Sequence, residues 1–233
     1  MDEEKGIQVE LQATNNMERR LTFWRILGGI VRNPSWFLPQ AVNKVSLLLP
    51  TLLMVGVTVF TSVITGILQK ERLVFVLREE LATYPNMSAK LIEEIIKVVT
   101  SPTFFVISAI GVSVIAIINW LIRAGILHLL IRKLLGGKGN FRQAFGIVAY
   151  AWVPILIYNI LKMLSIIVMG NVLDLRVLGL TNIIISKLNP FNIWSFILLI
   201  IGFSNVYNVK KPKVTITVIG VWLLDILISI IVL

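Results

Sequence analysis

The residue best placed to do chemistry inside a membrane is Asp225, which lies within the otherwise uncharged run from Val214 to Leu233. A charge at the bilayer centre costs about 2.5–3.5 kcal/mol on insertion scales. We therefore expect a protonated acid, a hydrogen bond to a neighbouring helix, or a place on an ion pathway. Ion paths normally contain several such groups, so a packing hydrogen bond is the favoured interpretation. The alternative is a small transporter or channel, whose path would be lined by Asp225, Asn119, Asn159 and Pro154.

Two other features resemble known kinds of site. The glycine-rich turn from Gly136 to Asn140 lacks the glycine spacing of a phosphate loop and the Ser or Thr that follows its lysine. It is interpreted as a flexible cytoplasmic turn; a weaker alternative is that Lys138 and backbone N–H groups hold a lipid phosphate. His128 has no second histidine or cysteine to share a metal, so packing near the membrane interface is predicted for it.

The known catalytic patterns are missing from the sequence. It contains no H-E-x-x-H, no G-x-S-x-G and no pair of intramembrane aspartates. The absence of cysteine also excludes disulfides and thiolate chemistry. The sequence therefore predicts no catalytic, metal-binding or cofactor-binding residue and a protein that is not an enzyme. A third, weaker option is an enzyme that acts on lipid head groups at the cytoplasmic face.

The elements that position these residues must lie in a membrane. Of the 233 residues, 57% are hydrophobic and 15% charged, against about a quarter charged in soluble domains. Mean hydropathy is +0.88. The net charge of +10 sits largely in short segments beside apolar runs, as the positive-inside rule requires. This placement argues against nucleic acid and favours the anionic head groups of membrane lipids as the partner.

Uncharged runs predict an all-α, polytopic membrane helical bundle of about five transmembrane helices. Residues 1–44 are predicted to form a cytoplasmic N-tail, and residues 45–233 the membrane domain. The predicted spans are 45–69, 98–122, 143–161 or longer, 188–209 and 214–233. Residues 163–186, with Asp174 and Arg176, would either extend the third span and lie on the membrane surface or form a sixth span.

The distribution of Lys and Arg favours five spans. Five spans place 14 of these residues on the side of the N-tail and 8 on the other side, whereas six spans leave 11 on each side. The positive-inside rule then predicts a cytoplasmic N-terminus and an outer C-terminus.

The segments that flank the first span are amphipathic. In residues 19–32, apolar side chains (Phe23, Trp24, Leu27, Ile30) recur at helical spacing among arginines, which predicts a helix in the cytoplasmic interface with those side chains at the acyl boundary. The dipeptide Asn33-Pro34 should end it. The charged stretch from Lys70 to Lys97 predicts two short helices separated at Tyr84-Pro85-Asn86.

The order of features resembles the Yip domain family, the Ypt/Rab-interacting membrane proteins. The resemblance rests on an aromatic-basic segment that ends at Phe37, on a glycine turn, and on the openings of two later spans. The motif residues are Gly136, Gly137, Gly139, Phe141, Tyr150, Pro154, Pro190, Phe191 and Trp194. Asp225 matches no family motif.

The resemblance implies a cytoplasmic N-terminus and a non-enzymatic protein that interacts with lipids or proteins, with a link to membrane trafficking or organisation. In eukaryotes it implies other membrane proteins and small GTPases of the Rab type as partners. The Ile/Lys-rich, cysteine-free composition is typical of a prokaryotic member, for which the plasma membrane is the expected location.

Overall fold

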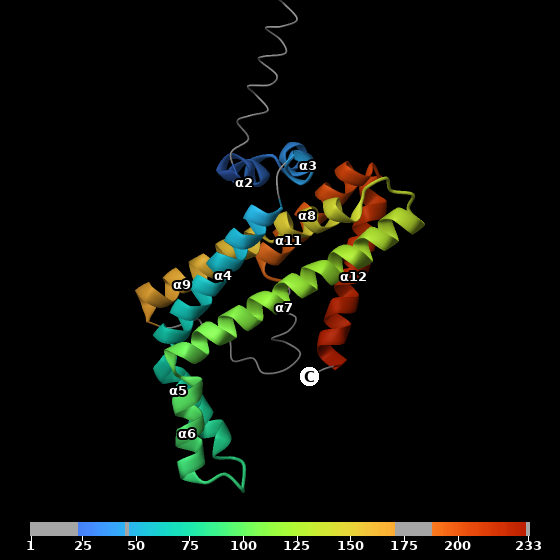
Figure 1. The fold of residues 1–233 in the computed structure, drawn as a ribbon. Coiled ribbons are helices and arrows are strands. Elements are labelled where there is room, and N and C mark those ends of the chain that lie inside the picture. Colours follow the sequence, from blue (N-terminus) through green and yellow to red (C-terminus); the bar gives the residue numbers. More distant parts are fainter. Residues whose placement is uncertain (1–22, 45–46, 171–187, 232–233) are drawn as a thin grey trace, which may run out of the picture.

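The computed structural model describes residues 23–44, 47–170 and 188–231, and every regular element in these ranges is a helix, as predicted. Helices α4, α7, α8–α9 and α11 contact one another to form a bundle, with α2 and α3 across one end and the α5–α6 hairpin projecting from the other (Figure 1). The helices are α2 (Phe23–Arg32), α3 (Pro34–Lys44), α4 (Leu48–Leu68), α5 (Lys70–Leu81), α6 (Ala89–Val99), α7 (Pro102–Leu129), the π-helix η1 (Leu130–Leu134), α8 (Phe141–Ala151), α9 (Val153–Met169), α11 (Pro190–Tyr207) and α12 (Lys211–Ile231).

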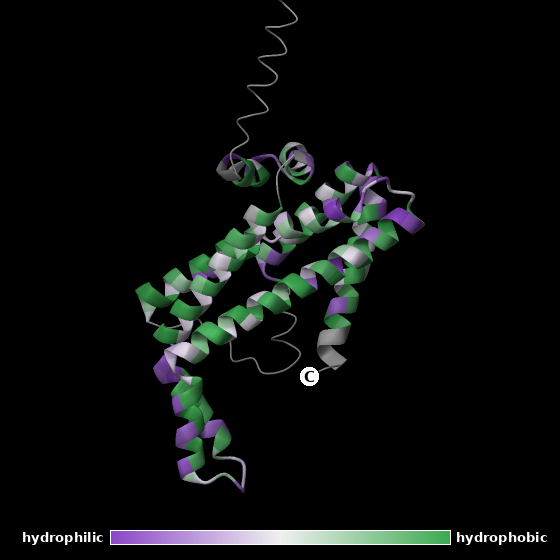
Figure 2. Ribbon diagram, viewed as in Figure 1, coloured by the Kyte–Doolittle hydropathy of each residue, from purple (hydrophilic) through white to green (hydrophobic). Residues whose placement is uncertain are grey.

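Four described helical segments are long and apolar enough to cross a membrane: Thr51–Leu68, Pro102–Leu134, Phe141–Met169 and Pro190–Tyr207. Figure 2 shows that the residues of these segments are largely hydrophobic. The fifth predicted span falls in α12, whose 21 residues reach about 31 Å at 1.5 Å per residue. The chain is therefore a multi-pass helical membrane protein.

Capping side chains and prolines fix where two of these spans begin. Ser101 caps α7 by accepting a hydrogen bond from the N–H of Phe104, and Asn189 caps α11 in the same way from Asn192. Proline follows each cap, at a position where the missing N–H has no helical partner to lose.

The long central helices differ from the predicted spans in one consequential way. Helix α7 continues past Ile122 and ends in a π-helical turn at Leu134. Arg123, which lies just beyond the predicted span 98–122, therefore falls inside the candidate span Pro102–Leu134. The third span breaks between α8 and α9 at Trp152, where Pro154 occupies the first turn of α9.

The N-terminal helices pack on the bundle. Helix α2 ends at Arg32 as predicted, but a second helix, α3, begins at once at Pro34 and contacts α8 and α11. Ile26 and Ile30 are fully buried in the protein core. Ile30 was predicted to face the acyl chains, and this was wrong, because α3 covers that side of α2. Residues 1–22 of the predicted cytoplasmic tail lie outside the part of the chain that the structure describes, and so does the side chain of Trp24.

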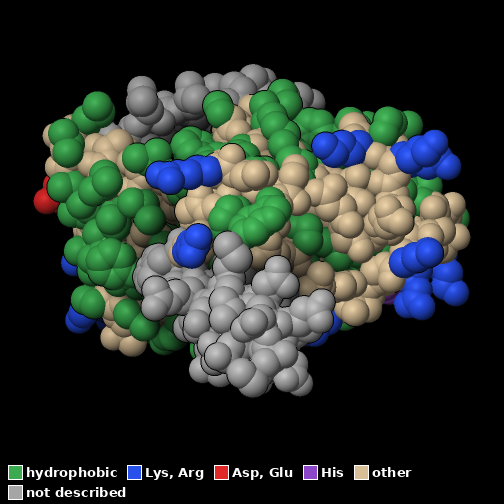
Figure 3. Space-filling model, turned by 90° about the horizontal axis from the view of Figure 1, so that it is seen from above, with side chains coloured by type: hydrophobic (Ala, Val, Ile, Leu, Met, Phe, Trp, Pro, Cys, Tyr) green, Lys and Arg blue, Asp and Glu red, His purple; other side chains and the backbone are tan. Residues whose placement is uncertain are grey.

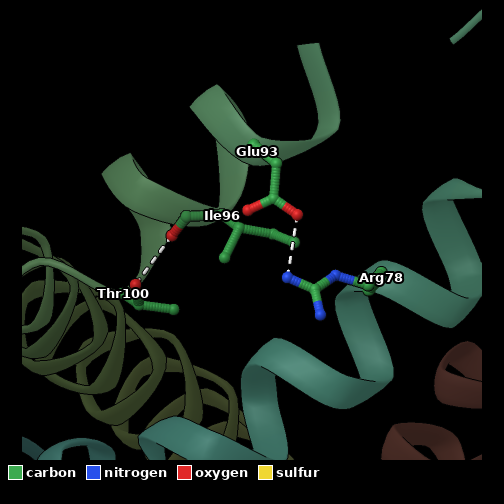
Figure 4. A network of polar contacts seen from close by, with 4 residues as sticks. All are labelled: Arg78, Glu93, Ile96 and Thr100. Carbon is green, nitrogen blue, oxygen red and sulfur yellow. Dashed lines mark hydrogen bonds and ion pairs between the residues drawn. The ribbon is translucent and has the colours of Figure 1, made fainter. Parts of the chain in front are cut away.

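The predicted pair of short helices outside the bundle is confirmed. Helices α5 and α6 form a hairpin around Tyr84-Pro85-Asn86, and Ser88 caps α6. Arg78 and Glu93 join them through an ion pair of 2.8 Å, while Thr100 hydrogen-bonds the carbonyl of Ile96 (Figure 4).

The ambiguous stretch after the third span is described only at its start. Helix α9 reaches Met169 and ends at Gly170, whose φ of 68° is the left-handed conformation that suits glycine at a helix end. Lys162 is exposed on α9. Asp174, Arg176 and the choice between a surface segment and a sixth span lie outside the described residues.

Candidate functional site

The glycine turn is held rigidly against the end of α11. The N–H of Lys138 donates to the carbonyl of Tyr207 at 3.0 Å, and the N–H of Gly137 donates to Ile131 at 3.0 Å. A Cβ on Gly139 would lie 2.4 Å from the Tyr207 ring, closer than any real contact. Gly136 has a φ of 71°. The turn was predicted to be flexible, but its glycines permit close packing and a left-handed backbone.

Below this turn, a hydrogen-bond chain joins two spans. The Nδ1 atom of His128 lies 2.6 Å from the hydroxyl of Tyr207, and that hydroxyl donates to the carbonyl of Asn140 at 3.0 Å. A hydroxyl has one proton and the carbonyl only accepts, so the network assigns the proton of the histidine to Nδ1. His128 is therefore buried and hydrogen-bonded. The sequence analysis did not single out Tyr207 as a functional residue. The feature that could have indicated it is a polar aromatic residue at the end of an apolar run.

Further side chains join the N-terminal layer to the same end of the bundle. Asn140 and Gln143 form a capping box at the start of α8, and the amide of Gln143 donates to Asn43 of α3 at 2.7 Å. The amide of Asn205 donates to the carbonyl of Ser35 at 3.0 Å. Helix α3 is thus fixed to both α8 and α11.

The remaining residues that carried the sequence resemblance lie at helix ends or in the core, and the structure does not gather them into one site. Tyr150 is fully buried, and its hydroxyl has no hydrogen-bond partner among the described residues. The ring of Phe141 stands edge-on to His128 at 6.1 Å, and Phe191 packs on Tyr158 at 5.4 Å. Pro154 begins α9 and Pro190 begins α11, while Trp194 is half-buried against the core.

Charge is distributed unevenly between the two ends of the molecule. The end that carries α2, α3 and the glycine turn holds a group of exposed basic side chains, here called the basic face: Arg25, Arg32, Arg132, Lys133, Lys138, Arg142, Lys210, Lys211 and Lys213. Figure 3 looks down on this end. Within the described part of the chain, the acids are Asp225 in α12 and five glutamates, all of them in the α5–α6 hairpin. The described acids therefore lie outside the basic face.

A polar cavity that is partly open to the surface lies between α7, α11 and α12, away from the basic face. Its volume is about 240 Å³, and it is lined by Arg123, Trp152, Asn192, Ser195, Phe196, Trp222 and Asp225. Nη2 of Arg123 lies 3.6 Å from Oδ2 of Asp225, so the two side chains form an ion pair between α7 and α12.

Asp225 thus has a charged partner, where the sequence predicted a neutral packing hydrogen bond. The other residues of the predicted path, Asn119, Asn159 and Pro154, do not line this cavity. The sequence did not indicate Arg123 as the partner of Asp225, because a basic residue at the end of an uncharged run is normally assigned to a loop.

Comparison with known proteins places the chain by its sequence alone. Neither the curated proteins nor the solved structures give a match. A family model does match: the Yip1 domain, over residues 28–233, which is nearly the whole chain. The match begins in the middle of α2 and covers α3, the glycine turn and all the later helices. The protein is a member of the Yip1 domain family of integral membrane proteins.

Proposed function

We propose that the protein is a non-enzymatic membrane component whose basic face binds the anionic head groups of its own membrane, and which contributes in this way to membrane organisation. The observation that carries the proposal is the basic face itself. Its side chains are exposed, come from six separate elements or turns, and have no described acid among them.

The packing of the N-terminal layer supports this role. Ile26 and Ile30 are buried on one side of α2, while Arg25 and Arg32 remain exposed on the other. An amphipathic helix at an interface combines apolar burial with attraction to anionic lipid. Here the apolar burial occurs within the protein, so the arginines are presented by a fixed scaffold. Each basic group near an anionic surface contributes about 1 kcal/mol.

The proposal includes an orientation. The basic face lies on the cytoplasmic side, as the positive-inside rule requires, with the N-terminus inside, the C-terminus outside and the α5–α6 hairpin outside. For a prokaryotic member the membrane would be the plasma membrane. Other membrane proteins and small GTPases are further candidate partners for the same face, because a positive surface also attracts acidic proteins.

The test measures which lipids gather around the protein. The full chain is reconstituted in phosphatidylcholine vesicles with a small fraction of fluorescent phosphatidylglycerol, and energy transfer from tryptophan reports local enrichment. We expect enrichment at low salt that falls in concentrated salt, since the Debye length shrinks to about 3 Å at 1 M. The variant Lys210→Gln/Lys211→Gln/Lys213→Gln should reduce it.

The matched control removes three lysines at the other end of the bundle, Lys70→Gln/Lys90→Gln/Lys97→Gln, and should leave the enrichment unchanged. Equal losses in the two variants, or no enrichment in the wild type, would contradict lipid recognition by the basic face.

The cavity favours a second candidate, a small transporter or channel with its polar path at Asp225. In that role Asp225→Asn should abolish coupling, because an amide cannot titrate. Proton or ion flux into vesicles under a gradient distinguishes the candidates. Flux in the wild type that disappears in Asp225→Asn would favour transport, and our proposal expects no flux in either protein.

A further inference from the structure

Within the basic face, six cations gather where the ends of α7, α11 and α12 meet. They come from three segments that are far apart in the sequence: the π-helix η1, the glycine turn, and the start of α12 with the residue before it. Figure 3 shows Lys and Arg side chains close together along one edge of this end of the molecule. We call this group the basic corner; its members, all exposed, are Arg132, Lys133, Lys138, Lys210, Lys211 and Lys213.

Packing and hydrogen bonds hold the three segments together. The π-helix η1 contacts both α11 and α12. The N–H of Lys138 donates to the carbonyl of Tyr207, the last residue of α11, at 3.0 Å. Ser204 fixes the chain that follows, because its hydroxyl donates to the carbonyl of Val209 at 2.7 Å and its carbonyl accepts from the N–H of Val209 at 3.0 Å. The backbone positions of the cations are therefore set before a ligand binds, which lowers the ordering cost of binding.

No described acid lies in the basic corner. Asp225 is twelve residues beyond Lys213 on α12, about 18 Å along the helix, and the described glutamates are in the α5–α6 hairpin. This distance exceeds the Debye length of about 8 Å at physiological salt. Membrane topology alone requires basic residues on this side of the bilayer, but it does not require them to converge from three segments. Convergence suits a ligand that carries more than one negative charge.

Exposed apolar side chains lie directly beside these cations. Leu134 follows Lys133 and is 73% exposed, and Ile216, one turn after Lys213 on α12, is 74% exposed. Both belong to long apolar helices, so acyl chains are the expected neighbours of their side chains. Cations next to lipid-facing apolar side chains fit the head group and chains of one lipid molecule better than a soluble polyanion.

The number of cations indicates the type of head group. A lipid with one phosphate brings a single negative charge and neutralises only part of the corner. A lipid with two phosphates on a short spacer can reach cations of different segments at once. Its second contact is intramolecular, so no further molecule has to be immobilised.

From this arrangement we infer that the basic corner is a binding site for a membrane lipid whose head group contains two phosphates, the chemistry of a cardiolipin. One phosphate lies on the side of η1, where the guanidinium fork of Arg132 matches phosphate geometry, and the other lies beside the lysines of α12. The acyl chains lie along Leu134 and Ile216. The inference rests on the proposed binding of anionic head groups by the basic face, and it adds which head group is preferred and where it binds.

The experiment compares two lipids at equal phosphate. The full chain is reconstituted in phosphatidylcholine vesicles with a small fraction of fluorescent cardiolipin or, in a second set, twice that fraction of phosphatidylglycerol with the same fluorophore. Energy transfer from tryptophan reports the enrichment of each lipid. We expect about tenfold greater enrichment per phosphate for cardiolipin, since its second phosphate engages one or two additional basic groups. Inorganic pyrophosphate at the same phosphate concentration should not displace cardiolipin, because it has no acyl chain.

Two matched variants locate the site within the basic face. Lys210→Gln/Lys211→Gln removes two charges from the basic corner and should reduce the preference for cardiolipin to about twofold or less. Arg25→Gln/Arg32→Gln removes two charges from α2, outside the corner. It should lower the enrichment of both lipids alike and keep the preference. All four side chains are exposed, so both variants are expected to fold, and thermal unfolding in detergent checks this.

The outcomes separate this inference from the proposed function. Salt-dependent enrichment of both lipids that is equal per phosphate would overturn the two-phosphate site and leave the proposed function standing. Equal loss of the preference in the two variants would overturn the placement at the corner, and displacement by pyrophosphate would overturn the assignment to a lipid. Absence of enrichment for both lipids would contradict the proposed function and the inference together.

Discussion

His128 and Tyr207 are 79 positions apart in the sequence, yet Nδ1 of the histidine lies 2.6 Å from the hydroxyl of the tyrosine. This contact joins α7 to the last residue of α11. The same tyrosine supports the glycine turn through its ring, its hydroxyl and its backbone carbonyl. The glycine turn, which carried part of the sequence resemblance, is therefore structural: it fixes the end of the bundle that carries the basic face.

Loss of the Tyr207 hydroxyl should destabilise this end. Tyr207→Phe leaves Nδ1 of the buried His128 without its hydrogen-bond partner, and an unsatisfied buried polar group costs about 1–3 kcal/mol. The Asn140 carbonyl keeps the hydrogen bond from the N–H of Ala144. Thermal unfolding in detergent measures the loss. Tyr158→Phe, at an exposed tyrosine, is the matched control. Equal melting temperatures for the two variants would show that the hydroxyl contributes nothing.

A methyl group in the glycine turn should be costly as well. Gly139→Ala places Cβ 2.4 Å from the Tyr207 ring, and such overpacking costs about 1–3 kcal/mol. Gly111→Ala adds the same methyl group on α7, where nothing lies within 4 Å, and should be neutral or slightly stabilising. Melting temperatures again provide the comparison, and a larger loss at position 111 would contradict the packing.

The ion pair between Arg123 of α7 and Asp225 of α12 should show coupling in a double-mutant cycle. Arg123→Gln or Asp225→Asn alone should lower the free energy of unfolding by about 1–3 kcal/mol, less than for a fully buried pair because both side chains are partly exposed. The double variant should cost less than the sum of the two. Strictly additive effects would show that the two residues do not interact.

The α5–α6 hairpin should depend on its apolar contact more than on its ion pair. Ile96 is 5% exposed, and Ile96→Ala is expected to cost about 2–5 kcal/mol. Arg78 and Glu93 are exposed, so Glu93→Gln should cost at most about 1 kcal/mol. Hydrogen exchange of the α5 and α6 amides measures both. Faster exchange in Glu93→Gln than in Ile96→Ala would reverse this ranking.

The fold was largely predictable because membranes impose simple rules on sequence. Long uncharged runs predicted the spans, and Tyr84-Pro85-Asn86 predicted the break in the outer hairpin. The site was much less predictable. A sequence shows that Asp225 lies in an apolar run, but only the packing of α7 against α12 reveals Arg123 as its partner.

A sequence does not show which elements pack together, and this also explains the two wrong predictions at the end of the molecule that carries α2, α3 and the glycine turn. Periodicity identified the apolar side of α2, but it could not tell whether lipid or α3 would cover Ile30. Likewise, glycines in a turn suggest flexibility until the ring of Tyr207 is seen against Gly139.

The most direct test of the account asks which side of the membrane the basic face occupies. The chain has no cysteine, so single cysteines report position without background. Asn86 in the hairpin turn and Lys138 in the glycine turn are exposed and suit the purpose, whereas the nearby Ser88 and Asn140 cap helices. In intact bacterial cells, a membrane-impermeant maleimide should label Asn86→Cys at once and Lys138→Cys only after permeabilisation. The reverse pattern, with Lys138→Cys labelled from outside, would contradict a cytoplasmic basic face.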